Sequence, residues 1–293
     1  MRINTNVSSL TAQEANANTN KTLSSSLEKL STGYRINKAS DDASGLAIAD
    51  KLRTQANGLN QAVANGNSAV TLTQIADKAM AEQSNILDII KQKLIQASTA
   101  TTSTAGIEAI GKDINKLLDQ VNNIGAQTTY NGTNLLQGTA SAGSVTSADT
   151  LVFQMGTLAA DTIGTKSGVL ANLAGLNGMS ALALSAAGWS AGLDSAAAMQ
   201  SAARVQMAEI DSALTQLNGW RADYGSTQNQ LESSIRNLMT QVTNTKAAES
   251  VIRDVDYAQE SANFNKQNII AQAGTYAISQ ANAASQNVMR LLQ

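Results

Sequence analysis

Apolar residues recur at spacings of three and four near both ends of this 293-residue chain, and Asn, Gln, Ser and Thr fill most positions between them. This spacing predicts an amphipathic helix at each end, because residues three and four apart share one helix face. The predicted assembly seams are Ile3, Val7, Leu10, Leu23, Leu27 and Leu30 at the N-terminal end, and Ile270, Ala273, Ala277, Ala281, Ala284, Val288 and Leu291 at the C-terminal end.

These two terminal seams hold too few large side chains to keep either helix folded alone. Burying one Leu or Ile gains roughly 1.5–3 kcal/mol, whereas ordering one backbone residue costs about 1–2 kcal/mol. We therefore expect the two ends to become ordered by pairing with each other and with further copies of the chain. The pattern is typical of an assembly protein.

Helical patterns also fill most of the chain between the ends. Residues 43–100 form one pattern, residues 107–124 a shorter one, and residues 210–252 a heptad seam typical of coiled coils. We favour packing of the heptad seam against the first two helices, and a zipper between two chains is the alternative. The apolar positions predicted for the first helix are Leu59, Val63, Val70, Leu72, Ile75, Ala79, Ile86 and Ile90, flanked by Leu87 and Leu94. Glycines 45, 58 and 66 indicate a close helix approach.

The segment 135–195 differs in composition, being rich in Gly, Ser, Thr and Ala. Residues 130–134 carry a turn signal, residues 151–155 are the best strand candidate, and residues 160–190 could add one or two short strands. The predicted fold class is mainly α: a long antiparallel helical coiled-coil rod with a small β-hairpin and loop tip, whose terminal helices pair with each other. The Ser and Thr residues of the tip are read as solvated loop, with glycan attachment as the alternative.

The composition excludes several kinds of site. The chain has no Cys and no His, so it lacks disulfides, thiolate metal sites and the commonest general base. We expect no enzyme activity, metal or cofactor. The acids of the run Ser40-Asp41-Asp42 are interpreted as a helix start beside a hinge rather than as a metal or acid–base pair.

Charge and hydropathy narrow the possible partners. The net charge is −2 without a long basic cluster, which argues against nucleic acid. No apolar run reaches about 18 residues, so we expect no membrane span. The first residues, MRINTNVSSL, lack the pattern of a cleavable secretory signal. An exported form of this chain would need another route.

Three stretches resemble a known family. They are LEKLSTGYRINKASDDASGLAIADKLR (Leu27 to Arg53), AQTTYNGTNLL (Ala126 to Leu136) and ANAASQNVMRLL (Ala281 to Leu292). The first resembles the N-terminal signature of bacterial flagellin, the subunit of the flagellar filament, and the other two are similar to later parts of the same family. Together the similar regions cover roughly residues 1–140 and 195–293.

The resemblance implies a division of the chain. Residues 1–42 and 255–293 would form the inner filament core, residues 43–140 and 196–254 the two halves of a helical rod, and residues 141–195 a short β and loop tip. It also implies a spoke between core and rod at Tyr34, Arg35, Asn37, Asp41 and Asp42. We expect Arg35 to pair across subunits, and solvated loop residues are the alternative.

The family further implies export of the unfolded chain through the flagellar type III apparatus into an extracellular filament used for swimming. Its usual partners would be other flagellin copies, a cap protein, hook-junction proteins and a cytoplasmic chaperone on the C-terminal helix. Two other hypotheses stay open: a hook-junction protein with the same helical ends, and a secreted helical effector or adhesin that acts as a monomer.

One family surface is altered here. Many flagellins carry an Arg-x-Arg-Glu-Leu patch that the innate flagellin receptor of animals recognises, and this chain aligns Ile89, Ile90, Lys91, Gln92 and Lys93 there. A Lys point charge does not replace the planar fork of Arg. We therefore expect weak or absent receptor activation.

Overall fold

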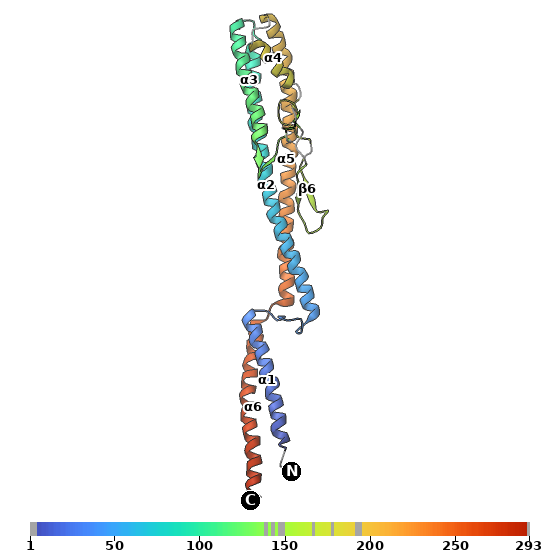
Figure 1. The fold of residues 1–293 in the computed structure, drawn as a ribbon, viewed down its shortest axis with the longest axis vertical. Coiled ribbons are helices and arrows are strands. Elements are labelled where there is room, and N and C mark those ends of the chain that lie inside the picture. The colour runs from blue at the N-terminus through green and yellow to red at the C-terminus, as the bar shows by residue number, and fades with distance from the viewer. Residues whose placement is uncertain are drawn as a thin grey trace. The chain divides into compact units, whose positions relative to one another are not determined.

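The computed structural model describes residues 5–137, 140–141, 144–145, 150–165, 168–176, 179–190 and 195–291. These residues contain six helices of different lengths and six short strands (Figure 1). The predicted fold class is confirmed in its main features: long helices pack lengthwise, and the strands form small antiparallel pairs. The helices are α1 (Val7–Thr32), α2 (Ala43–Ala97), α3 (Thr104–Gln127), α4 (Met179–Ser190), α5 (Ala196–Arg253) and α6 (Tyr257–Leu291).

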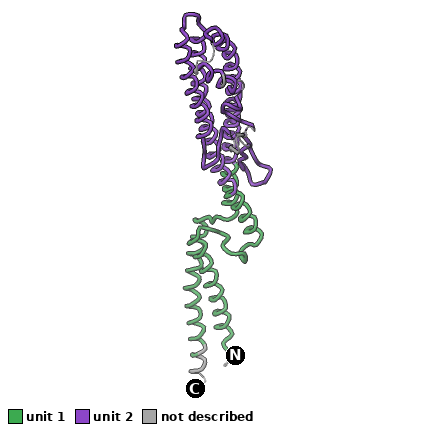
Figure 2. The backbone as a smooth tube through the Cα atoms, turned by 45° about the horizontal axis from the view of Figure 1, so that its top comes forward, with its two compact units in different colours: residues 1–57, 241–293 green, residues 58–240 purple. Residues whose placement is uncertain are grey.

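The chain divides into two compact units, drawn in different colours in Figure 2. One unit joins residues 1–57 to residues 241–293, and we call it the terminal unit. The other unit is residues 58–240, which we call the central unit. The long helices α2 and α5 contribute residues to both units.

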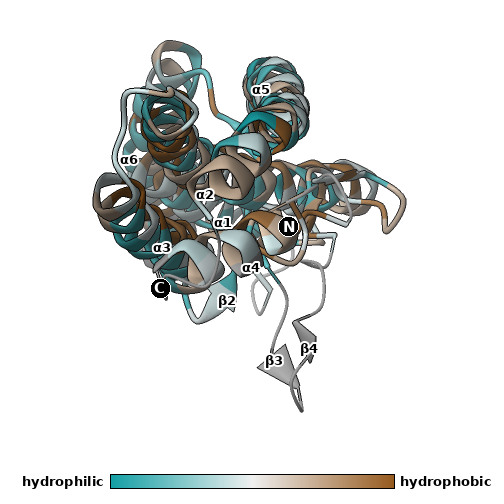
Figure 3. Cartoon of the chain, turned by 90° about the horizontal axis from the view of Figure 1, so that it is seen from above, coloured by the Kyte–Doolittle hydropathy of each residue, from teal (hydrophilic) through white to brown (hydrophobic). Residues whose placement is uncertain are grey.

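The central unit has a continuous apolar core built from α2, α3, α4 and α5. In the end-on view of Figure 3, α5 carries polar residues on one side and apolar residues on another. Fully buried members of this core include Leu87 and Ile90 of α2, Ile107 and Ile114 of α3, and Ile210 and Leu217 of α5. The heptad seam of α5 thus packs within the chain up to the end of this unit, as we had favoured.

Ion pairs at the edges of the core join the same helices. Arg221 of α5 lies 2.9 Å from Asp77 of α2, and Lys91 of α2 pairs with Asp211 of α5. All four side chains are about a third or more exposed, so each pair contributes little stability. Each pair can form only when the two charged residues lie side by side, so the pairs favour one register of α2 against α5.

The predicted seam of α2 is wrong in part. Leu59, Leu72, Ile86 and Ile90 are buried as predicted, but Val63, Val70 and Ala79 are only half-buried and Ile75 is exposed. The regular heptad face that is buried contains smaller neighbours of Val63, Val70 and Ile75. That face consists of Leu59, Ala62, Gly66, Ala69, Thr73, Ala76, Met80, Gln83, Leu87, Ile90, Leu94 and Ala97. Its small residues let a neighbour approach: a Cβ on Gly66 would lie 2.8 Å from Ile235 of α5, so the inference of a close helix approach at this glycine is confirmed.

The segment between α3 and α5 combines short strand pairs with a helix. The predicted turn after α3 joins β1 (Thr129–Tyr130) to β2 (Thr133–Asn134), with Asn131 at φ 50° and Gly132 at φ 80°. Positive φ at both central positions is the signature of a type I′ hairpin turn. The remaining pairs are β3 (Ala140–Ser141) with β4 (Ser144–Val145), and β5 (Val152–Gln154) with β6 (Thr162–Gly164).

The strand expected at residues 151–155 is therefore present as β5, but the region 160–190 holds more than short strands. Its second half forms α4, which packs on α3 and buries Met179, Leu182 and Trp189. Apolar or small residues lie on every side of α4 itself, so its sequence shows no helical period. This explains why the pattern of polar and apolar positions did not predict the helix.

In the terminal unit, α1 and α6 lie side by side and run in opposite directions. The amide of Asn6, just before α1, donates to the carbonyl of Ala281 near the end of α6 at 3.0 Å. At the other end of α1, Gly33 accepts a hydrogen bond from the backbone N–H of Val255 at 3.0 Å. The predicted pairing of the two chain ends is confirmed.

Candidate assembly interface

The most deeply buried positions of α1 against α6 are small and polar. The buried residues of α1 are Ser9 and Ser26, and Asn16 lies opposite Gly274 of α6, where a Cβ would meet it at 3.4 Å. Half-buried positions between them include Ala12 and Leu23 on α1, and Phe264, Ala271 and Ile278 on α6. A seam of this composition removes little apolar surface from water.

Most of the predicted seam residues lie away from the partner helix. Val7, Leu10 and Leu27 are 60%, 54% and 56% exposed, and Ile270 is 42% exposed. Ala273, Ala277 and Ala284 are also exposed, whereas Leu23, Leu30 and Ala281 are half-buried. Ile3 lies outside the described residues, as do the side chains of Val288 and Leu291.

Two further exposed side chains extend this apolar surface, and the sequence pattern did not single them out. Ile269 is 68% exposed and Tyr276 is 73% exposed, both on α6. Ile269 adjoins the predicted seam residue Ile270, so a broader reading of the α6 face would have included it. The terminal helices thus keep several large apolar groups on the outside of the single chain.

Local sequence gives α1 defined ends but a weak interior. Asn6 caps its start by accepting from the N–H of Ser9 at 3.2 Å, and Gly33 ends it at φ 76° with a bond to the carbonyl of Lys29. Within the helix, hydroxyl groups bond back to carbonyls one turn earlier, at Thr11, Thr19, Thr22, Ser24 and Thr32. Such residues are poor helix formers because their side chains compete for backbone groups.

The segments 33–42 and 252–256, which we call the crossover, join these helices to α2 and α5. Tyr34 and Asp254 form an isolated antiparallel bridge, and the N–H of Arg35 donates to the carbonyl of Arg253 at 2.7 Å. The guanidinium of Arg35 donates to the carbonyl of Ile252 at 2.6 Å, so this side chain has a partner within the chain.

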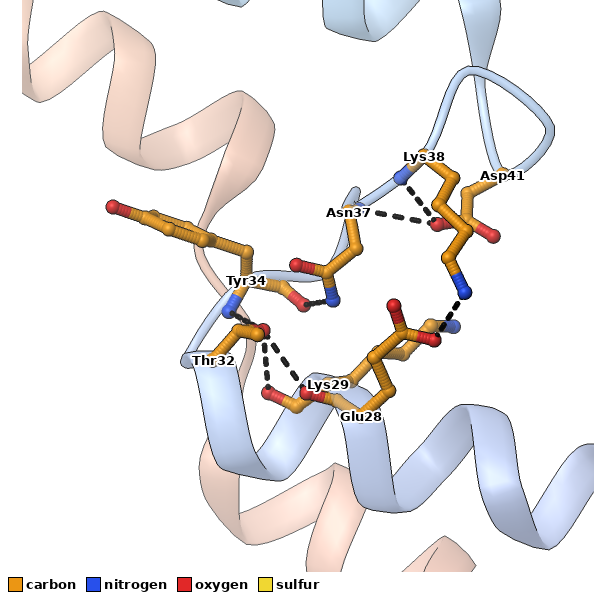
Figure 4. A network of polar contacts seen from close by, with 7 residues as sticks. All are labelled: Glu28, Lys29, Thr32, Tyr34, Asn37, Lys38 and Asp41. Carbon is orange, nitrogen blue, oxygen red and sulfur yellow. Dashed lines mark hydrogen bonds and ion pairs between the residues drawn. The ribbon is translucent and has the colours of Figure 1, made fainter.

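Three of the predicted spoke residues, Tyr34, Asn37 and Asp41, meet in one polar network of the crossover (Figure 4), whereas Arg35 and Asp42 bond elsewhere. The Asp41 carboxylate accepts from the backbone N–H groups of Lys38 at 2.9 Å and Asn37 at 3.1 Å, and these bonds lower the pKa of Asp41. The Lys38 ammonium lies 2.7 Å from Glu28, which raises the pKa of Lys38. Asn37 also donates to the carbonyl of Tyr34 at 3.2 Å.

The two acids after Ser40 have different partners, and only Asp42 contacts the start of α2. The Asp42 carboxylate accepts from the N–H of Gly45 at 2.9 Å, as a capping side chain does. A Cβ on Gly45 would lie 2.8 Å from Ile36, which is buried, so the chain passes closely over the first turn of α2. The helix-start interpretation therefore accounts for Asp42, whereas Asp41 instead binds the turn at residues 37 and 38.

Sequence reasoning missed a contact between Arg253 of the crossover and Asp50 of α2. The Arg253 guanidinium lies 4.3 Å from the centre of the Tyr34 ring, and its Nη1 atom lies 4.0 Å from Asp50. The only sequence signal near Arg253 is Asp256, whose carboxylate caps α6 by accepting from the N–H groups of Ala258 and Gln259. That signal marks a helix start but not the ring contact.

The five positions of the altered receptor patch do not share one face. Ile90 is fully buried in the core, whereas Ile89 is 43% exposed and Gln92 is exposed. Lys91 pairs with Asp211, and Lys93 lies 3.1 Å from Asp113 of α3. Both lysines are therefore engaged within the chain.

Two regions of the chain match one protein family. Residues 3–141 match the bacterial flagellin N-terminal helical region, and residues 207–292 match the bacterial flagellin C-terminal helical region. The chain belongs to the flagellin family. Among the described residues, no helix combines the length and the hydropathy needed to cross a membrane.

Full-length relatives agree with this assignment. The chain is 35% identical to the flagellin of Bacillus subtilis (strain 168) over 312 residues, and 35% identical to the flagellar filament 30.7 kDa core protein of Treponema maltophilum over 296 residues, with 100% of both chains covered in each case. Its fold resembles a putative flagellar hook-associated protein from Vibrio parahaemolyticus, with a TM-score of 0.61 and 13% identity over 73% of this flagellin and 99% of that chain.

Proposed function

We propose that this flagellin is the structural subunit of an extracellular bacterial flagellar filament that serves swimming, and that its terminal helices complete their folding only within the filament. The observation that carries this proposal is the placement of apolar groups in the terminal unit. Val7, Leu10 and Leu27 of α1 and Ile269 and Tyr276 of α6 are more than half exposed. The most deeply buried positions between the two helices are small and polar.

The mechanism follows from this difference between the two units. The chain is exported unfolded through the type III apparatus, and the central unit then folds around its own apolar core. The terminal helices bury their outward faces against neighbouring copies, and each large side chain buried in this way contributes roughly 1.5–3 kcal/mol. Because packed interfaces have discrete arrangements, small shifts between copies allow alternative filament shapes.

The remaining parts of the assignment belong to the same proposal. Residues 1–42 and 255–293 act as the filament core, and residues 43–140 and 196–254 act as the rod around residues 141–195. Tyr34, Arg35, Asn37, Asp41 and Asp42 act as the spoke. A cap protein, hook-junction proteins and an export chaperone on α6 are the other partners, and the buried Ile90 and engaged lysines favour weak receptor activation.

The second candidate is a hook-junction protein, which the likeness of fold to the hook-associated protein favours. A junction protein would cap a filament without forming a long polymer. Purified chain added to short filament fragments separates the two functions: a filament subunit elongates the fragments, and a junction protein only caps them. Failure of the chain to elongate the fragments would contradict our proposal.

Variants test the terminal faces directly. Deleting residues 270–293 should abolish elongation and leave the central unit helical by circular dichroism. Leu10→Asn should slow elongation at least about tenfold, since losing roughly 1.5 kcal/mol of burial corresponds to that factor. The matched control is Leu158→Asn, because Leu158 is 67% exposed outside the terminal helices. Equal effects of the two Asn variants would contradict the role assigned to the terminal seam.

A further inference from the structure

One cationic side chain joins its own segment to two others of the terminal unit that are far away in sequence. Arg253 ends α5, and its side chain is 14% exposed. Its guanidinium lies over the ring of Tyr34, which follows α1, and it also faces the carboxylate of Asp50 in α2. The last turn of α5, the exit from α1 and the early part of α2 therefore meet at this side chain.

The backbone beneath this contact needs support. Segments 33–35 and 253–255 are joined by two hydrogen bonds, from Arg35 N to Arg253 O at 2.7 Å and from Val255 N to Gly33 O at 3.0 Å. A two-stranded pair of this size is at best marginally stable in water. The Arg253 side chain stacks on the ring of the residue that forms the isolated bridge, Tyr34, and so reinforces the pair from one side.

Stability alone does not explain an arginine here. Its Nε atom is buried and has no hydrogen-bond partner among the described residues, which is unfavourable. An apolar side chain of similar length would avoid this cost. The planar guanidinium instead provides a stacking surface for the ring and a charge toward the carboxylate, and this combination fixes an orientation.

We propose that Arg253 is a positioning residue of the crossover: stacked on Tyr34 and facing Asp50, it fixes the geometry in which segment 33–35 pairs with segment 253–255. That geometry sets the direction in which α1 and α6 leave the crossover, and so the direction in which their outward faces meet neighbouring copies. The inference rests on the proposed function as a filament subunit. Its consequence is a uniform filament shape that depends on this contact.

The test uses full-length variants assembled as a minority with wild-type chain, so that a weakened variant still enters the filament. Arg253→Met removes the charge and keeps the length of the side chain, whereas Arg253→Lys keeps the charge. Tyr34→Leu removes the ring, and Tyr34→Phe keeps it. The matched control is Arg53→Met, because Arg53 binds the same Asp50 at 2.9 Å from within α2.

The first readout is hydrogen exchange at the N–H groups of Arg35 and Val255 in the filament. Arg253→Met and Tyr34→Leu should each speed exchange by about 5- to 30-fold, as expected for a partly desolvated cation–π contact. The double variant should be no faster than the single ones, since both remove the same contact. Arg53→Met and Tyr34→Phe should stay within about twofold of wild type, and Arg253→Lys should lie between Met and wild type.

The second readout is the waveform of filaments made from each variant alone, seen by dark-field microscopy. Arg253→Met should give an altered or mixed waveform, and Arg53→Met the wild-type waveform. The proposal is overturned if Arg253→Met exchanges like Arg53→Met, if Lys and Met variants are equally fast, or if the two single effects multiply. Failure of wild-type chain to elongate fragments would instead overturn the proposed function, so the two failures are distinct.

Discussion

Gly125 of α3 is a position in the central unit where adding one methyl group should be costly. A Cβ there would lie 2.5 Å from the backbone carbonyl oxygen of Ala171. That oxygen accepts a buried hydrogen bond from the Gln83 amide at 2.7 Å. The same amide donates to the carbonyl of Val121 at 2.9 Å. The methyl group must therefore push the 171 backbone away from Gln83.

The magnitude of the Gly125→Ala effect follows from three opposing contributions. Ala gains about 1 kcal/mol over Gly in a helix interior. Overpacking costs about 1–3 kcal/mol, and loss of a buried hydrogen-bond partner for Gln83 costs about 1–3 kcal/mol more. We expect a net destabilisation of about 2–4 kcal/mol. For a unit of this size, that lowers Tm by about 5–15 °C.

Thermal unfolding of the unpolymerised chain, followed by circular dichroism, measures this change. The matched control is Gly219→Ala in α5, where a Cβ meets nothing within 4 Å. It should raise stability by about 0.5–1 kcal/mol, because only the helix preference acts. The two substitutions are thus expected to shift Tm in opposite directions. A stabilising Gly125→Ala would refute the close contact between α3 and the 171 backbone.

Two further predictions concern pH. Burial raises the pKa of Tyr224 to about 12, so its neutral form contributes stability that is complete below pH 10 and is lost between pH 10 and about 12. Urea titrations at pH 10 and pH 12 measure this loss. Between these pH values the wild-type free energy of unfolding should fall by about 2–3 kcal/mol more than that of Tyr224→Phe, and equal falls would contradict the prediction. The lowered pKa of Asp41 contributes stability above pH 3.8 that disappears as pH falls through its folded pKa. As pH falls below 3.8, filaments of Asp41→Asn should therefore lose less light scattering than wild-type filaments lose. Equal losses would count against the Asp41 network.

Periodicity predicted the long helices because apolar residues repeat there over many turns, but it misplaced the α2 seam. Large residues such as Val63, Val70 and Ile75 drew the prediction to one face, while Ala62 and Gly66 line the contact. A hydrophobic pattern weighs size, whereas close helix packing needs small residues. The helix α4 was missed for a related reason, since a segment that is apolar all round has no period.

The assembly interface could be predicted only in part. Val7, Leu10 and Ile270 were identified as seam residues, but the sequence did not show that their helices meet through other faces. Arg253 could not be found because its partners Tyr34 and Asp50 are remote in sequence and share no spacing with it. Contacts of this kind depend on how the chain crosses itself, which no local pattern records.

The account depends on terminal helices that gain order from neighbouring copies, and hydrogen exchange tests this most directly. Exchange is measured for the backbone N–H groups of α1 and α6 in dilute, unpolymerised chain and again in filaments. We predict fast exchange in both helices of the free chain, slow exchange in the filament, and slow exchange of the central unit in both states. Equally slow exchange of α1 and α6 in the free chain would contradict the account.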